Sequence, residues 1–345
     1  MTWLTADLAG SGGILRSDPE DFVVEEILAY EASGSGEHAF AQIEKTALTT
    51  PHAAERLAEA IGLRPREVGY AGLKDKHART RQWMSFPVPV KAPLPELGDL
   101  GDDLRVLSVE RHGNKLKRSH ARGNRFAITI RDTVPDGADR AAAILDRMRA
   151  TGVPNAFGPQ RFGRDGDNAQ RALRILRGDE RRPKNRRVAQ LLFNALQSEV
   201  FNRVLALRIE GGLLSTALVG DVMKKHDSGG LFDVADPAAE QPRVDRVEIS
   251  PTAALPGKKT RRADGQPQAM EDEALRSVGL GEEETRRLDV GTRRALRFPL
   301  DPEARIEPVD GGYRLHVALP AGAYATVLLA ELIKPAEGVV ERTEG

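Results

Sequence analysis

Apolar and polar residues alternate over much of the first 130 residues, and this pattern predicts short β-strands. Residues 22–29 (FVVEEILA) and 37–45 (EHAFAQIEK) are the first two, because alternation gives a strand one apolar face and one polar face. Further strands are predicted at residues 68–72, 81–90, 104–111 and 125–131. In the last of these, Phe126, Ile128 and Ile130 share one face. The N-terminal part of the chain is therefore rich in strand signal.

One helix interrupts these strands. In TTPHAAERLAEAIG, Thr50 is predicted to be the N-cap, Pro51 the first helical residue and Gly62 the C-terminal stop, because each residue type is favoured at that place. The next segment is GYAGLKDKHARTRQW, residues 69–83. Its K-D-K is predicted to lie in or beside a tight connection between two strands.

Helical spacing dominates the middle of the chain. Helices are predicted at residues 139–150, 168–176 and 188–209. Residues 233–294 are rich in Pro, Glu, Arg and Ala and have poor periodicity. Strand signal returns at residues 304–319, with a D-G-G hairpin turn at 310–312, and an apolar helix is predicted at 323–333. Strand-rich ends around a helix-rich middle predict a mixed core that an inserted domain interrupts.

The composition is that of a folded protein without cysteine chemistry. Of 345 residues, 40% are hydrophobic and 30% are charged, as in ordinary globular proteins. The absence of cysteine from the sequence excludes disulfides, thiolate nucleophiles and cysteine-ligated metals, and it fits a cytoplasmic protein. The first residues lack a signal-peptide pattern, and no apolar run approaches the length of a membrane span.

The formal net charge is zero, yet the basic residues are clustered. Residues 111–125 (RHGNKLKRSHARGNR) hold six Lys or Arg, two His and no acid, and two further clusters are RRPKNRR at 181–187 and KKTRR at 258–262. Solvated loops are one interpretation of each cluster. The three together favour a polyanionic ligand, because cationic side chains release the counterions of a phosphate backbone.

Common cofactor and metal motifs are missing from the sequence. LPGKKT has Thr252 where a P-loop needs its first glycine, and Gly10, Gly12 and Gly13 do not complete a dinucleotide fingerprint. RDGDNA lacks the pattern of a calcium loop, the histidines show no metal-ligand spacing, and no serine lies in a nucleophile elbow. An enzyme of this sequence would work with carboxylates, basic side chains and aromatic rings.

Asp75 is a single carboxylate between Lys74 and Lys76, with further basic residues after it. A solvated surface turn is the commoner explanation of an isolated K-D-K. A catalytic loop is the other, because a connection between two strands aims a side chain outward from a rigid support. The residues alone leave both explanations open.

Five separated motifs resemble the TruD family of tRNA pseudouridine synthases. They are LRSDPEDFVVEE (15–26), GYAGLKDKHARTRQW (69–83), RGNRF (122–126), GVPNAFGPQRFG (152–163) and LPAGAYAT (319–326), in the family's order. The resemblance covers nearly the whole chain and is weak between residues 233 and 294.

The resemblance implies a fold and a reaction. The fold would be α+β, a pseudouridine synthase-like mixed and largely antiparallel sheet with flanking helices, interrupted by an inserted α/β TRUD-type domain. Its parts would be a catalytic domain at 1–151 and 298–345 and the inserted domain at 152–297. The family converts uridine in tRNA to pseudouridine, typically at position 13 of the D arm, and uses no metal or cofactor.

The resemblance also assigns the central site residues. Asp75 matches the essential aspartate, which could attack C1′, stabilise positive charge there or take the 2′ proton. The target base must leave its stack, and an aromatic face would hold it. Phe126 matches the family's stacking phenylalanine, and Asn124 matches a nearby polar contact. Phe22 would line the site, and for Phe22 and Phe126 a core position is the other interpretation.

Two assignments depart from the family pattern. Arg16 stands where the family usually has lysine and would place a cation near the carboxylate, with a different fork geometry. Tyr324 stands where phenylalanine is common, so the ring is kept and a hydroxyl is added. Both are expected to contact the substrate.

The basic segment is expected to bind the tRNA backbone through Lys115, Lys117, Arg118 and Arg122. No membrane, metal or protein partner is predicted. A catalytically silent tRNA-binding or chaperone protein of the same fold is the alternative, and the basic clusters support it equally well. A carboxylate hydrolase of glycosidic bonds would need a second acid, for which the sequence offers no convincing candidate.

Overall fold

A computed structural model describes residues 2–15, 18–117 and 120–334 of the chain. The fold divides into two compact units. Unit 1 comprises residues 2–9, 143–300 and 323–334, and unit 2 comprises residues 10–142 and 301–322. The division into a catalytic and an inserted domain stays a prediction. Among the described helices, none has both the length and the apolar character that crossing a bilayer needs.

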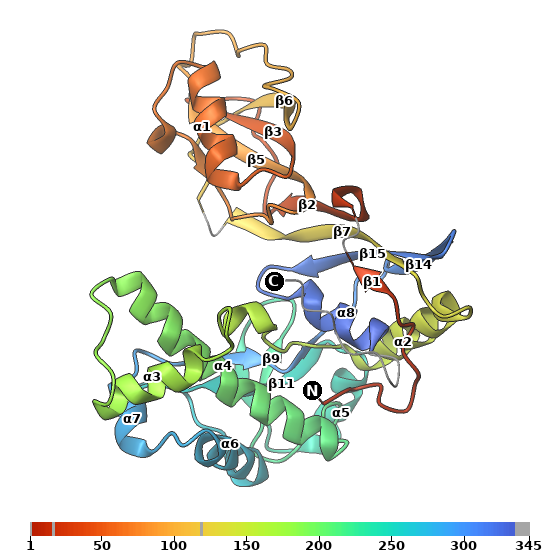
Figure 1. The fold of residues 1–345 in the computed structure, drawn as a ribbon. Coiled ribbons are helices and arrows are strands. Elements are labelled where there is room, and N and C mark those ends of the chain that lie inside the picture. Colours follow the sequence, from red (N-terminus) through yellow and green to blue (C-terminus); the bar gives the residue numbers. More distant parts are fainter. Residues whose placement is uncertain (1, 16–17, 118–119, 335–345) are drawn as a thin grey trace. The chain divides into compact units, whose positions relative to one another are not determined.

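Unit 2 is built on one nine-stranded sheet (Figure 1). Its strands are β1 (Ile14–Leu15), β2 (Phe22–Leu28), β3 (His38–Thr46), β4 (Gly69–Tyr70), β5 (Arg79–Pro87), β6 (Leu104–His112), β7 (Ala121–Arg131), β14 (Arg305–Val309) and β15 (Gly312–Pro320). The main path runs β14-β15-β7-β2-β5-β3-β6, with β1 beside β7 and β4 beside β5. All pairs are antiparallel except β2 with β5, which confirms the predicted α+β class.

Helix α1 (Thr50–Ala60) lies across β3, β5 and β6 (Figure 1). Its buried residues Ala53, Ala54, Leu57 and Ala58 form a core with the inward residues of these strands. The predicted cap was wrong by one residue. Thr49 is the N-cap and accepts a hydrogen bond from the His52 amide, whereas Thr50 is buried inside the first turn.

Strand β7 begins earlier than predicted. It starts at Ala121, so Arg122 and Asn124 belong to the strand and not to a loop before it. Gly123 allows this, because a Cβ there would collide with the carbonyl oxygen of Leu319 on β15. The last part of the basic segment is therefore ordered backbone within the sheet.

Unit 1 combines helices with two small sheets. Its helices are α3 (Asn168–Arg177), α4 (Arg186–Glu210), α5 (Pro237–Asp245), α6 (Gly265–Ser277), α7 (Glu282–Arg287) and α8 (Ala325–Ile333), and α2 (Gly137–Thr151) contains the boundary with unit 2. Its strands are β8 (Val153–Pro154), β9 (Val222–Lys225), β10 (Leu231–Asp233), β11 (Ile249–Leu255), β12 (Thr292–Ala295) and β13 (Arg297–Phe298). The sheets are β10-β9-β11-β12 and β13-β8.

The segment with poor periodicity, residues 233–294, is ordered. Strand β11 (ISPTAAL) is buried on both faces at nearly every position, so it shows no alternation of apolar and polar residues. Helix α5 contains Pro242 within its span, a residue that argues against a helix in sequence patterns. The sequence pattern therefore predicts neither β11 nor α5.

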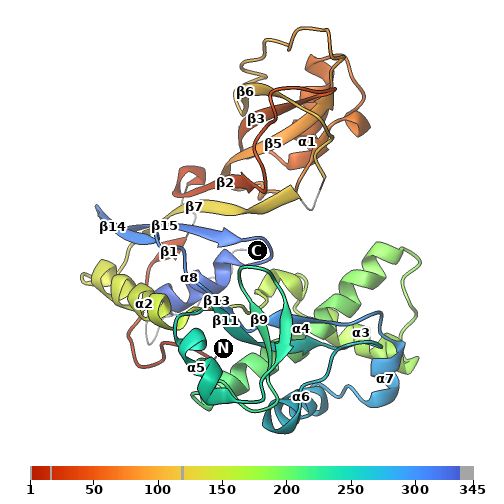
Figure 2. The same cartoon turned by 180° about the vertical axis from the view of Figure 1, so that it is seen from behind.

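Helix α4 is the central helix of unit 1 and packs against α3, α6 and β11 (Figure 2). Arg208, near its C-terminal end, forms a buried ion pair with Asp221, the residue before β9. Arg208 also donates to the carbonyl oxygens of Leu213 and Thr216. Removing one member of such a pair would strand a buried charge, so the pair fixes α4 against the sheet.

Candidate active site

Asp75 lies in an eight-residue loop, residues 71–78, between β4 and β5 of unit 2. Its side chain is exposed. The amide of His77 donates to the Asp75 Oδ1 atom at 3.0 Å, a local turn in which an aspartate carboxylate accepts from the backbone two residues on. The loop thus presents the carboxylate at the surface in a defined orientation.

The backbone of the loop is held on both sides of the Cα of Asp75. The Lys74 amide donates to the Thr50 Oγ1 atom at 2.9 Å, and the Thr50 hydroxyl donates to the Gln82 Oε1 atom at 2.9 Å. The Asp75 carbonyl oxygen accepts from the Lys45 Nζ atom at 2.9 Å. Residues of α1, β3 and β5 therefore fix this loop.

Lys74 clamps the loop onto the sheet. Its Nζ atom lies 2.7 Å from the Glu26 Oε1 atom on β2 and donates to the Asn124 Oδ1 atom on β7 at 2.6 Å. The Glu26 side chain is completely buried and the Lys74 side chain is 7% exposed. The second Glu26 oxygen accepts from the Trp83 amide at 3.1 Å. The ion pair consequently joins β2, β5, β7 and the Asp75 loop.

The same face of the sheet carries the two predicted phenylalanines. Glu26 is the register partner of Asn124, Val24 of Phe126, and Phe22 of Ile128, so alternate residues of β2 and β7 point to one side. The rings of Phe22 and Phe126 meet edge to face at 6.1 Å, and both are largely buried. The structure thus places Asn124, Phe126 and Phe22 on the face that Lys74, next to Asp75, contacts.

Basic residues after the loop are partly neutralised. Arg79 and Arg81 each lie 2.8 Å from an oxygen of Glu44 on β3. Burial acts to raise the pKa of Glu44, but the two guanidinium groups outweigh it and lower that pKa below its usual value. Arg79 and Arg81 therefore stabilise the pairing of β5 with β3.

Lys45 on β3 is also buried. Burial lowers the pKa of Lys45 to about 8, although the nearby Asp75 charge opposes this.

Tyr324 belongs to unit 1, where it precedes α8. Its ring contacts Phe157 at 5.9 Å. Tyr324 is partly buried and packs against the hydrophobic core of unit 1. Arg16 and Arg118 lie outside the described residues.

The predicted RNA-binding residues that the structure describes differ in exposure. Lys117 and Arg122 are exposed. Lys115 is half-buried, and its Nζ atom donates to the Arg66 carbonyl oxygen at 2.8 Å. Lys115 therefore supports the turn before β4, whereas Lys117 and Arg122 offer their charges to solvent.

The sequence pattern assigned no structural role to Lys74, Glu26 and Lys45, which hold the Asp75 loop in place. A signal was present, because Glu26 follows Phe22 and Val24 on the inward face of an alternating strand, where a charged residue needs a buried partner. Which cation would fill that place could not be read from the pattern. Among the described residues, no group of three or more His, Asp or Glu side chains is arranged to hold a metal ion.

Comparison with known proteins identifies the family. The model of the family "tRNA pseudouridine synthase D (TruD)" matches residues 1–183 and 182–332. A tRNA pseudouridine synthase D from Anaeromyxobacter sp. (strain Fw109-5) is 44% identical over 99% of this chain and 98% of the relative. One from Thermus thermophilus is 43% identical over 96% of this chain and 92% of the relative.

The fold has a solved counterpart. A crystal structure of a Methanosarcina mazei protein assigned to tRNA pseudouridine synthase D covers 97% of this chain and 96% of that chain, with a TM-score of 0.78 and 23% sequence identity. The enzyme class that these findings define is that of the pseudouridine synthases, which are isomerases. The chain belongs to the tRNA pseudouridine synthase D family.

The buried ion pair yields a stability prediction. Lys74→Met should lower the free energy of unfolding by about 3–5 kcal/mol, because the Glu26 carboxylate would stay buried without its cation. The double variant Lys74→Met/Glu26→Gln should recover part of this loss, since no unpaired charge remains. Urea-induced unfolding measures both. Arg64→Met, which breaks an ion pair whose arginine is 66% exposed, is the control and should cost less than about 1 kcal/mol.

Lys45 yields a pH prediction with a defined sign. Its pKa is about 8 in the fold and 10.5 when unperturbed, so between these values the unfolded chain holds the proton more strongly. The penalty for burying the charge is present in full at pH 7 and is relieved as the pH rises. Raising the pH from 7 to 10 should therefore stabilise the parent relative to Lys45→Met by about 2 kcal/mol. A difference that stays constant with pH would show that burial does not perturb Lys45.

Proposed function

We propose that the chain isomerises uridine to pseudouridine in tRNA, with Asp75 as the catalytic carboxylate. The N1–C1′ bond of the uridine breaks, the uracil turns, C5 bonds to C1′, and the proton leaves C5 while N1 regains one. The reaction is redox-neutral, and the proposed mechanism uses side chains alone. On the family resemblance, the target is the uridine at position 13 of the D arm.

One observation supports the role of Asp75 above others. The loop backbone is fixed immediately before and at Asp75 by Thr50 and Lys45, while the carboxylate itself is exposed. Such rigidity around an exposed charged group suits a residue that must meet a sugar carbon in one orientation. A plain surface turn would not need a buried lysine beneath it.

The hydrogen bonding of Asn124 suggests how the uracil is oriented. The Asn124 Oδ1 atom accepts from Lys74, so the amide nitrogen is the part of the side chain left to face a substrate. We infer that this nitrogen donates to a carbonyl oxygen of the uracil. Phe126, two residues along the same strand face, would then offer its ring to the base.

Asp75→Asn tests the proposal directly. The substitution removes the charge and the nucleophilic oxygen but nearly conserves shape, so pseudouridine formation should fall below detection. Affinity for tRNA should be kept or modestly increased, because a negative charge facing a polyanion is lost. Mapping pseudouridine in tRNA after incubation with each purified protein measures activity and shows the position modified.

The matched control is Asp102→Asn, which alters another exposed aspartate of unit 2 and should leave activity unchanged. A normal rate with Asp75→Asn would refute the assignment. A parent protein that binds tRNA but forms no pseudouridine would identify the chain as the silent tRNA-binding protein instead.

Phe126→Leu separates stacking from core packing. Loss of the ring should reduce turnover about tenfold, because one stacked base contributes roughly 1–3 kcal/mol, whereas tRNA affinity rests mainly on phosphate contacts. Phe86→Leu, in the same unit and 1% exposed, provides the comparison. Phe86→Leu should lower the midpoint of thermal unfolding about as much as Phe126→Leu does, but it should leave turnover unchanged. Equal turnover in the two variants would assign Phe126 to the core.

A further inference from the structure

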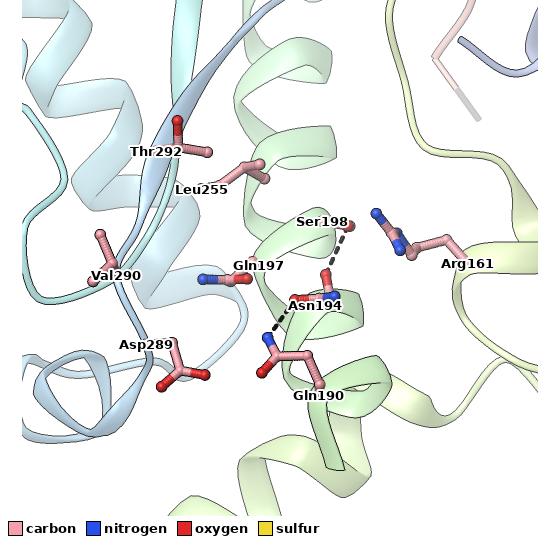
Figure 3. A pocket seen from close by; sticks show the side chains of 9 residues that line it. All are labelled: Arg161, Gln190, Asn194, Gln197, Ser198, Leu255, Asp289, Val290 and Thr292. Carbon is pink, nitrogen blue, oxygen red and sulfur yellow. Dashed lines mark hydrogen bonds between the residues drawn. The ribbon is translucent and has the colours of Figure 1, made fainter. Parts of the chain in front are cut away.

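Unit 1 contains a pocket of about 220 Å³ between α4 and the chain around the start of β12 (Figure 3). Polar side chains make up most of its lining. The lining residues are Arg161, Gln190, Asn194, Gln197, Ser198, Leu255, Asp289, Val290 and Thr292. The volume is below the roughly 300–1,000 Å³ of pockets that enclose drug-sized ligands, so it suits a single small ring system.

One wall is a polar face of α4. Gln190, Asn194 and Gln197 are spaced so that they share one side of the helix, as Figure 3 shows. Gln190 donates to the Asn194 Oδ1 atom at 2.9 Å, and Gln197 donates to the Pro256 carbonyl oxygen at 2.7 Å. These bonds leave the Asn194 amide nitrogen as a donor and the Gln197 amide oxygen as an acceptor for a ligand.

The opposite wall adds an acceptor and an apolar surface. Asp289 supplies a carboxylate, and Leu255 and Val290 supply aliphatic side chains. Val290 is 68% exposed, although it is a large apolar residue. Amide, hydroxyl and carboxylate groups around an apolar surface match the edges and the face of a nucleobase.

Arg161, from the motif GVPNAFGPQRFG, stands at the edge of the pocket (Figure 3). Its guanidinium carbon lies 4.9 Å from the centre of the Phe157 ring, and that of Arg294 lies 4.3 Å from the same ring. The buried Arg161 Nε atom has no hydrogen-bond partner among the described residues. Both guanidinium groups are thus held near one aromatic ring, whose face stabilises their charge.

Basic residues also border the pocket. Arg186 and Arg187 lie one helical turn before Gln190, and the Lys258 amide donates to the Asp289 carbonyl oxygen at 3.3 Å. These three side chains are exposed, and none forms an ion pair with a carboxylate of the described chain. Asp289 is an exposed lining residue whose negative charge disfavours a phosphate within the pocket, whereas the surrounding cations attract a phosphate at its border.

We propose that this pocket binds the base of one unpaired nucleotide of the RNA, and that the surrounding cations bind the adjacent phosphates. This inference rests on the proposed function for the class of its ligand, a tRNA, and adds a second base contact to the uridine bound at the Asp75 loop. An unpaired nucleotide is required, because the bases of an A-form duplex do not present their faces to a pocket.

Binding of two RNAs tests the proposal. The double variant Gln190→Ala/Asn194→Ala should weaken binding of a tRNA transcript about tenfold, as expected for the loss of one base-edge contact. Its affinity for a fully paired RNA hairpin of equal length should not change. Arg186→Glu should weaken binding of both RNAs, and the effect should shrink at high salt. Fluorescence anisotropy at two salt concentrations measures these affinities.

Matched controls exist on the same unit. Gln170→Ala alters an exposed glutamine of α3 outside the pocket, and Arg276→Glu alters an exposed arginine of α6. Each should leave tRNA affinity within about twofold of the parent. The proposal is overturned if the double variant binds tRNA as the Gln170 control does, or if it loses affinity for both RNAs equally.

If the double variant does not fold, a cross-linking experiment tests the pocket instead. A photo-reactive benzoylphenylalanine at position 190 should cross-link one unpaired nucleotide, whereas the same group at position 170 should not. Cross-links spread evenly over the tRNA, or absent at position 190, would overturn the pocket. Because binding and cross-linking require no turnover, they can be scored on Asp75→Asn also. Absence of pseudouridine with the parent protein would instead refute the proposed function.

Discussion

The candidate active site depends on the buried ion pair between Lys74 and Glu26. A carboxylate with no solvent exposure is costly unless a cation and further donors surround it, and here Lys74 and the Trp83 amide meet that need. The cation comes from the loop and the carboxylate from the sheet. The ion pair with Glu26 therefore fixes Lys74 and the loop against the sheet. Asp75 is the next residue, so its position is fixed as well.

Local patterns predicted the sheet well, because alternation is preserved wherever one strand face is buried, as in β2 and β7. Local patterns failed for β11, because both of its faces are buried and no alternation appears. They also failed at the start of α1, because two adjacent threonines, Thr49 and Thr50, could each serve as the N-cap. The placement of Phe22, Phe126 and Asn124 on one face followed from register, which no single segment contains. Their roles rest on the resemblance and on the proposal.

Zero net charge conceals two uses of basic residues. Arg79 and Arg81 are paired with Glu44, and the Lys115 Nζ atom donates to a backbone carbonyl oxygen, so these three cations have partners within the fold. Lys117, Arg122 and the residues at the start of α4 are exposed. Only burial and pairing, which are properties of the folded chain, distinguish the two groups.

The motif GYAGLKDKHARTRQW can be divided by what each position does. Gly69 is needed because a Cβ would lie 2.7 Å from the Leu116 carbonyl oxygen, and Ala71 and Ala78 are buried. Gln82 accepts from Thr50, and Lys74 neutralises Glu26. These roles maintain the loop. Asp75 differs, because its backbone is bonded to Lys45 while its carboxylate is exposed, and the proposed catalytic role requires this combination of a fixed backbone and an accessible carboxylate.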